Sequence, residues 1–172
     1  LTFAVVLDTF SLPLLWAGTN TLTGVLGAVA LFSYVAVYTP LKSRTHWAME
    51  VGAVPGALPP LMGWTAGSGH LEAGGLALFA ILFFWQLPHF LAIALFRQSE
   101  YRKAGLTSLP LAHGDAVARW TAVGTLVGLL AVSVLPVAVG LSGWLYLVVA
   151  LGLGAWFLKE GLDGARRQGN AV

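Results

Sequence analysis

The segment GTLVGLLAVSVLPVAV, at residues 124–139, lies inside a stretch from Trp120 to Leu158 that contains no charged side chain. A helix needs about 20 consecutive apolar residues to cross the hydrocarbon core of a bilayer. The stretch is therefore long enough for two crossings, divided at Gly140-Leu-Ser-Gly143. It lacks the alternation of apolar and polar residues that is typical of strands in a membrane barrel. We therefore predict an all-α transmembrane bundle.

The rest of the chain has the same apolar character. Of its 172 residues, 58% are hydrophobic and 9% are charged, with a mean hydropathy of +0.81. Soluble domains carry about 25% charged residues, so lipid is the expected surrounding and a nucleic-acid partner is not expected. Because unpaired backbone groups are costly in lipid, the apolar segments are predicted to be helices. We place six spans in one domain of residues 1–172, at roughly 1–17, 22–40, 48–66, 74–96, 118–139 and 143–158.

The positive charges predict the orientation of these spans. All 9 Lys and Arg residues fall on one side of the predicted bundle. Cytoplasmic connections are enriched in Lys and Arg, so this side is predicted to face the cytoplasm. The membrane is predicted to be the inner membrane of the cell. Both termini and the connection at 97–117 are expected there as well. The sequence contains no cysteine, which excludes disulfides and thiolate chemistry.

Two segments carry helix-breaking or polar residues inside predicted spans. The run GAVPGALPPLMGW (52–64) contains three prolines and several glycines, which predicts an interrupted helix lining a cavity. In FFWQLPHF (83–90), Gln86 and His89 are three residues apart, so we expect them to share a helix face. These side chains either bond to a neighbouring helix or contact a substrate, and the spacing alone does not decide between the two.

A polar cluster is predicted at the cation-rich side. Tyr38 and Lys42 are four residues apart, which suits either two membrane anchors or two ligand contacts. A cationic rim above an apolar interior fits an amphiphile with an anionic head, such as a lipid or an isoprenoid diphosphate. Mg²⁺ normally binds a diphosphate together with one or two carboxylates, and Glu100 is a candidate ligand. The cations of this rim are Lys42, Arg44, Arg97, Arg102 and Lys103.

Four segments together resemble a known family. They are YTPLKSRT (38–45), VGAVPGALPPLMGWTA (51–66), FFWQLPHFLAIALF (83–96) and EYRKAGLTSLP (100–110). In order and spacing they resemble the protohaem IX farnesyltransferase (haem O synthase) family of UbiA-type intramembrane prenyltransferases. The resemblance implies a nine-helix fold, of which this chain corresponds to helices three to eight. It also implies the substrates farnesyl diphosphate and haem B, the product haem O, and Mg²⁺ as cofactor.

The resemblance also implies roles for individual residues. Lys42, Glu100 and Tyr101 would be catalytic, and Glu100 would be a metal ligand. The haem or prenyl pocket would include Trp85, Gln86 and His89. The diphosphate would be bound by Tyr38, Lys42, Arg44, Arg97, Arg102 and Lys103.

The chain departs from the family pattern in two respects. The first Asn/Asp-rich motif and the ninth helix are absent, so we expect that the chain as given does not make haem O alone. Glu100 stands where the family usually has Asp. Two alternatives remain: a related prenyltransferase with a quinone-precursor or chlorophyllide acceptor, and a non-enzymatic transporter or assembly subunit.

Overall fold

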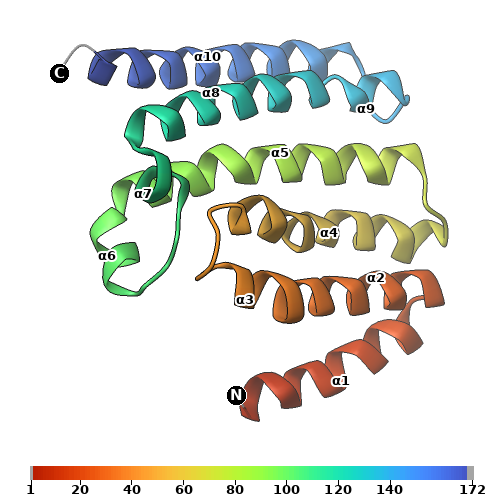
Figure 1. The fold of residues 1–172 in the computed structure, drawn as a ribbon. Helices are drawn as coiled ribbons and strands as arrows, with labels where there is room; N and C mark the ends of the chain where they lie inside the picture. Colours follow the sequence, from red (N-terminus) through yellow and green to blue (C-terminus); the bar gives the residue numbers. More distant parts are fainter. Residues whose placement is uncertain (1, 170–172) are drawn as a thin grey trace.

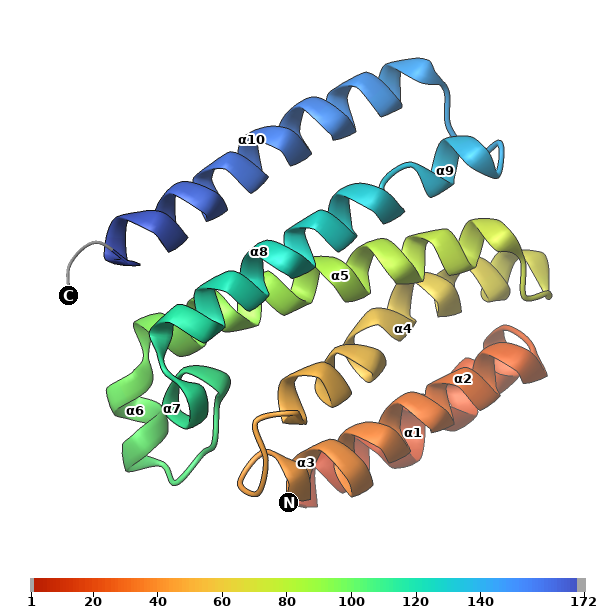
Figure 2. The same cartoon turned by 45° about the horizontal axis from the view of Figure 1, so that its top comes forward.

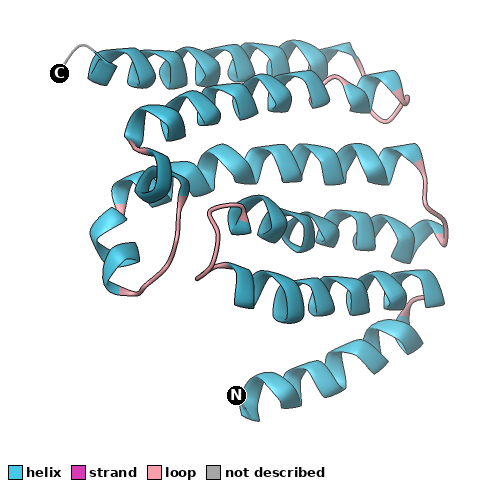
Figure 3. Cartoon of the chain, in the orientation of Figure 1, coloured by secondary structure: helices cyan, strands magenta, loops and turns pink. Residues whose placement is uncertain are grey.

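The chain folds into a row of antiparallel helices. The structure, a computed structural model, describes the backbone of residues 2–169 and the side chains of residues 9–166. These described residues form helices and no strand (Figures 1 and 3). The helices are α1 (Thr2–Gly18), α2 (Thr21–Phe32), η1 (Ser33–Tyr38), α3 (Thr39–Leu41), α4 (Ala48–Ser68), α5 (Ala73–Phe96), α6 (Gln98–Lys103), α7 (Leu109–His113), α8 (Asp115–Val132), α9 (Leu135–Ala138) and α10 (Trp144–Gly169).

The long helices pack in chain order. Helix α1 lies against α2, α2 against α4, α4 against α5, α5 against α8, and α8 against α10, an order that both views show (Figures 1 and 2). Four segments are long and apolar enough to cross a membrane: Thr21–Leu41, Ala73–Phe96, Asp115–Ala138 and Trp144–Arg166. The prediction of a polytopic all-α membrane bundle is confirmed.

One local expectation, an interrupted helix at residues 52–64, is wrong. The run at 52–64 does not interrupt a helix, because α4 is helical from Ala48 to Ser68 with three prolines inside it. Close packing on α5 compensates for the lost backbone bonds: the side chains of Ala53 and Ala57 are fully buried, and small residues let helices approach closely in membranes. The connection at 97–117 contains two short helices, α6 and α7.

The connections between the helices separate into two groups. The α3–α4 turn, the α6–α7 segment and both ends of the described chain lie at one end of the row (left in Figure 1). The connections at 19–20, 69–72 and 139–143 lie at the opposite end. The predicted gathering of the described cations at one end is therefore seen in the fold. That this end faces the cytoplasm stays a prediction.

A satisfied polar cluster joins α2 to α4 at the end opposite to the cations. The Asn20 side chain caps α2 by accepting from the backbone N–H of Thr23 at 2.9 Å, and its amide donates to the Thr65 carbonyl at 2.6 Å. The hydroxyls of Thr23 and Thr65 lie 2.9 Å apart, and both residues are fully buried. Because polar groups in an apolar surrounding are costly unless bonded, this cluster determines how α2 and α4 align.

Candidate functional site

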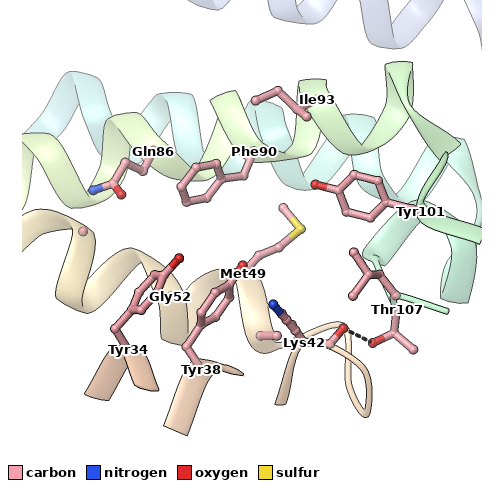
Figure 4. Close-up of a pocket in the computed structure, with 13 residues that line it drawn as sticks. Tyr34, Tyr38, Lys42, Met49, Gly52, Gln86, Phe90, Ile93, Tyr101 and Thr107 are labelled. Carbon is pink, nitrogen blue, oxygen red and sulfur yellow. Dashed lines mark hydrogen bonds between the residues drawn. The ribbon is translucent and has the colours of Figure 1, made fainter. Parts of the chain in front are cut away.

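A cavity of about 360 Å³ opens between η1, α4, α5 and the segment that follows α6. We call it the Tyr38 pocket. Its volume lies in the range of about 300–1,000 Å³ that is usual for small-molecule sites. The wall is mostly apolar, with a few polar groups at the cation-rich end (Figure 4). It is lined by Tyr34, Tyr38, Lys42, Ala48, Met49, Gly52, Gly56, Gln86, Phe90, Ile93, Tyr101, Leu106 and Thr107.

Two tyrosines on a π-helix form one wall of the pocket. Residues 33–38 form a π-helix between α2 and α3. The carbonyl of Tyr34 accepts from both the backbone N–H and the hydroxyl of Thr39, the latter at 2.9 Å. The rings of Tyr34 and Tyr38 lie side by side, with centroids 5.2 Å apart. Such π-turns occur frequently at functional sites.

Two glycines of α4 make room for polar side chains of the pocket. A Cβ atom on Gly52 would lie 2.7 Å from a ring carbon of Tyr38, and a Cβ atom on Gly56 would collide with the amide oxygen of Gln86. Gln86 is itself buried, and its amide nitrogen donates to the Leu82 carbonyl at 3.1 Å. The glycines of the 52–64 run therefore act by allowing close contact, without breaking the helix.

Lys42 and Tyr101 face the pocket from opposite sides of its mouth. Figure 4 shows the Lys42 ammonium and the Tyr101 hydroxyl pointing into the same space. The Lys42 carbonyl accepts from the backbone N–H of Thr107 at 3.2 Å and from its hydroxyl at 3.3 Å. These bonds hold the segment after α6 against the end of α3, which brings residues about 60 positions apart in sequence to one site.

Glu100 lies in a shallower cavity of about 470 Å³ beside the mouth. This cavity shares Ile93, Tyr101 and Leu106 with the Tyr38 pocket. Arg97 donates to the Glu100 carboxylate at 3.1 Å, with both side chains more than half exposed. Exposed pairs of this kind contribute about 0–1 kcal/mol, so the carboxylate can exchange partners at little cost.

The described residues contain no cluster of three His, Asp or Glu side chains suited to hold a metal ion. One carboxylate at the mouth, Glu100, still fits a Mg²⁺ ion whose other ligands are phosphate oxygens and water. Glu50 has a buried carboxylate oxygen without a hydrogen-bond partner in the described part of the chain, and it forms no ion pair there with Lys42 or Arg44.

The structure brings together most of the predicted site. Tyr38, Lys42, Gln86 and Tyr101 line the Tyr38 pocket, and Arg97 and Glu100 line the adjoining cavity. The side chains of the remaining cations are exposed at the same end of the row and line neither cavity. These cations are Arg44, Arg102 and Lys103.

Gln86 and His89 lie close together around α5 but line different cavities. Three residues turn an α-helix by about 300°, which leaves the two side chains about 60° apart around α5. Gln86 faces α4, whereas His89 faces α8 and α10 and stacks on Trp85 with ring centroids 4.9 Å apart. Trp85 and His89 therefore lie outside the Tyr38 pocket.

Several pocket residues were not singled out by the sequence. Tyr34 precedes Tyr38 by four residues, and Gly52 precedes Gly56 by four, so both pairs carry a helical spacing that indicates a shared face. Thr107 carries no such signal, because its contact with Lys42 exists only in the folded chain.

The fold is a membrane helix bundle, and its Tyr38 pocket has an apolar interior with a lysine and tyrosines at its mouth. Residues 1–170 match the model of the UbiA prenyltransferase family, and the chain belongs to this family. The match confirms the resemblance stated from the sequence motifs.

The chain is also similar to individual curated proteins. The chain is 55% identical over 169 residues to the protoheme IX farnesyltransferase of Myxococcus xanthus (strain DK1622), covering 98% of this chain and 58% of that protein. It is 52% identical over 164 residues to the protoheme IX farnesyltransferase of Sorangium cellulosum (strain So ce56), covering 95% of this chain and 59% of that protein. The chain thus spans less than two thirds of these relatives. No solved structure matches it.

Proposed function

We propose that the protein containing this chain transfers the farnesyl group of farnesyl diphosphate to a vinyl group of haem B, giving haem O. The observation that carries the proposal is the placement of Tyr38, Lys42 and Tyr101 at the mouth of an apolar pocket. The names of the two relatives indicate the donor and the acceptor, and favour haem over a quinone precursor or chlorophyllide. We further propose that the cation-rich end lies on the cytoplasmic side of the inner membrane.

The diphosphate would bind at the cation-rich mouth. Lys42 supplies a positive charge inside the pocket, and the hydroxyls of Tyr38 and Tyr101 supply donors for phosphate oxygens. Arg97 adds charge beside the mouth, while the exposed Arg44, Arg102 and Lys103 raise the local concentration of an anionic substrate. Mg²⁺, with Glu100 as one ligand, would neutralise further negative charge on the diphosphate when bound.

The farnesyl chain would lie along the apolar wall. Cleavage of the bond between carbon and the bridging oxygen releases diphosphate, whose growing charge Lys42 and the tyrosine hydroxyls stabilise. The allylic cation forms beside the rings of Tyr34, Tyr38 and Phe90, which lower its free energy through cation–π contact. The vinyl group attacks this cation to form the new carbon–carbon bond, and water then adds the hydroxyl group and releases a proton.

Gln86 is the polar group placed deeper in the pocket, away from the mouth (Figure 4). We propose that its amide contacts the porphyrin or the attacking water. Trp85 and His89 face a different cavity on the other side of the α5 backbone. A haem in the Tyr38 pocket would therefore meet Gln86 but neither of these two rings.

The test is haem O formation in membranes that contain the chain within its complete coding sequence. Haem B, farnesyl diphosphate and Mg²⁺ are added, and the product is identified by mass. Lys42→Ala should raise the KM for farnesyl diphosphate by about 10- to 100-fold, the cost of a lost hydrogen bond to a charged group. Glu100→Gln should raise the Mg²⁺ concentration needed for half-maximal activity.

Lys159→Ala is the matched control for Lys42→Ala, because Lys159 is an exposed lysine at the same end of the row and lines neither cavity. If Lys42→Ala and Glu100→Gln retained full turnover and unchanged substrate dependence, the assigned site would be wrong. If the product were a prenylated quinone precursor or chlorophyllide and not haem O, the assigned site would stand but the proposed acceptor would be wrong.

A further inference from the structure

A third cavity lies on the far side of α5 from the Tyr38 pocket. It has a volume of about 340 Å³ and is enclosed by α5, α8 and α10. We call it the Arg119 cavity. Its polar groups are Arg119 from α8, Glu160 from α10 and His89 from α5, and most other lining residues are apolar or small. The cavity shares no lining residue with the Tyr38 pocket.

The two charged groups of this cavity are not paired with each other. The Nε atom of Arg119 is buried without a hydrogen-bond partner among the described residues. The Arg97–Glu100 pair is the one salt bridge in the described part of the chain, so Arg119 and Glu160 do not form one. A buried guanidinium nitrogen without an acceptor is costly. The cavity therefore presents a cation and an anion, each available to a ligand.

The position of the charges along the helices fits the headgroup region of a bilayer. Arg119 is four residues from the start of α8, and Glu160 is nine residues from the end of α10. At 1.5 Å per residue these offsets are roughly 6 and 14 Å from the cation-rich ends of the helices. The stacked rings of Trp85 and His89 line the same cavity.

The walls of the cavity leave room for a ligand that enters from the lipid. A Cβ atom on Gly164 would meet nothing within 4 Å, so this part of α10 faces open space. The wall around the charged groups is apolar, with Leu95, Leu126 and Phe157 among its side chains. Acyl chains can lie along these side chains while a headgroup meets the charged groups.

We propose that the Arg119 cavity binds phosphatidylethanolamine. The lipid phosphate accepts charge-assisted hydrogen bonds from Arg119, and the primary ammonium donates to the carboxylate of Glu160. Both charges of the cavity are then satisfied by one headgroup. Phosphatidylglycerol leaves Glu160 without a cationic partner. Phosphatidylcholine carries a quaternary ammonium that has no N–H to donate.

The test measures lipid binding to the complete coding product in detergent by native mass spectrometry, with defined phospholipids that differ only in the headgroup. The wild type should bind phosphatidylethanolamine at least ten-fold more tightly than phosphatidylglycerol or phosphatidylcholine. Arg119→Ala and Arg119→Lys should weaken binding by roughly ten-fold or more, the loss expected for hydrogen bonds to a charged group. Glu160→Gln should retain binding of the phosphate but remove the preference for the primary ammonium.

Arg166→Ala and Asp163→Asn are matched controls, because both residues belong to α10, carry the same charges and do not line the cavity. Both should behave as wild type. Soluble glycerophosphoethanolamine should not compete, since it lacks the acyl chains. Competition by this soluble compound, or wild-type binding without headgroup preference, would overturn the proposal.

Circular dichroism during heating identifies variants that fail to fold. If folded Arg119→Lys and Glu160→Gln proteins bound all three lipids as the wild type does, the assignment would be wrong. Haem O synthesis is not needed for the measurement, so the lipid site and the proposed farnesyl transfer can fail independently.

Discussion

Replacing Gly52 by Ala tests whether the position of the Tyr38 ring is needed for activity. The added Cβ atom would lie 2.7 and 2.8 Å from two ring carbons of Tyr38. Ordinary contact lies at 3.4–4 Å, so the ring would have to move by about 0.7 Å to reach it. A displacement of about 1 Å in an active site can lower the rate by about 100-fold. We expect kcat/KM for farnesyl diphosphate to fall by about 10- to 100-fold.

The effect of Gly52→Ala on stability should be much smaller than its effect on activity. Alanine stabilises a helix interior by about 1 kcal/mol relative to glycine, whereas overpacking costs about 1–3 kcal/mol. The net change is therefore about 0–2 kcal/mol of destabilisation. Gly63→Ala is the matched control, because Gly63 is on the same helix and a Cβ atom there meets nothing within 4 Å.

The assay is haem O formation in membranes at varied farnesyl diphosphate, with thermal unfolding measured on the same preparations. Gly63→Ala should unfold at the wild-type temperature or slightly above it and retain wild-type turnover. If Gly52→Ala matched Gly63→Ala in kcat/KM while remaining folded, the placement of Tyr38 against α4 would not matter for the reaction.

Two further predictions concern the bundle. Asn20→Ala removes the cap of α2 and the hydrogen bond to the Thr65 carbonyl. We expect the unfolding free energy to fall by about 2 kcal/mol. The control Thr19→Ala removes only a local hydrogen bond to the Leu15 carbonyl and should cost less. If the two variants lowered the unfolding temperature equally, the cluster of Asn20, Thr23 and Thr65 would not stabilise the packing of α2 on α4. Because the chain has no native cysteine, Ser43→Cys should react with a membrane-impermeant thiol reagent only from the cytoplasmic side, and Ser142→Cys only from the other side. Labelling of both from one side would contradict the orientation.

Much of the fold was predictable from local composition. Each of the six apolar segments became one helical segment of the row, because the bilayer imposes a length and requires internal backbone bonding whatever the neighbours are. The charged residues likewise had to avoid the hydrocarbon core, which placed the described cations at one end. These constraints act on each segment separately, so their effects can be predicted from the sequence of that segment alone.

The prolines of α4 are a case in which prediction from the composition of one segment fails. Three prolines inside 21 residues weaken a helix, yet tight packing of Ala53 and Ala57 on neighbouring helices preserves it. The irregular backbone lies instead at residues 33–38, just before Pro40, which has no N–H to donate to the preceding turn. The packing of α4 on its neighbours, in contrast, is not a property of that segment alone.

The apolar segments and the positions of the charges are sufficient to predict the helices, their alternating directions and the end at which the cations gather. Which polar groups share a cavity depends on how the helices pack: Gln86 lies with Tyr38 and Lys42, whereas His89 lies with Arg119 and Glu160. The reason is the position of each side chain around the helix axis. Helix α5 packs against a different neighbour on each side, so Gln86 and His89, about 60° apart around its axis, line two different cavities.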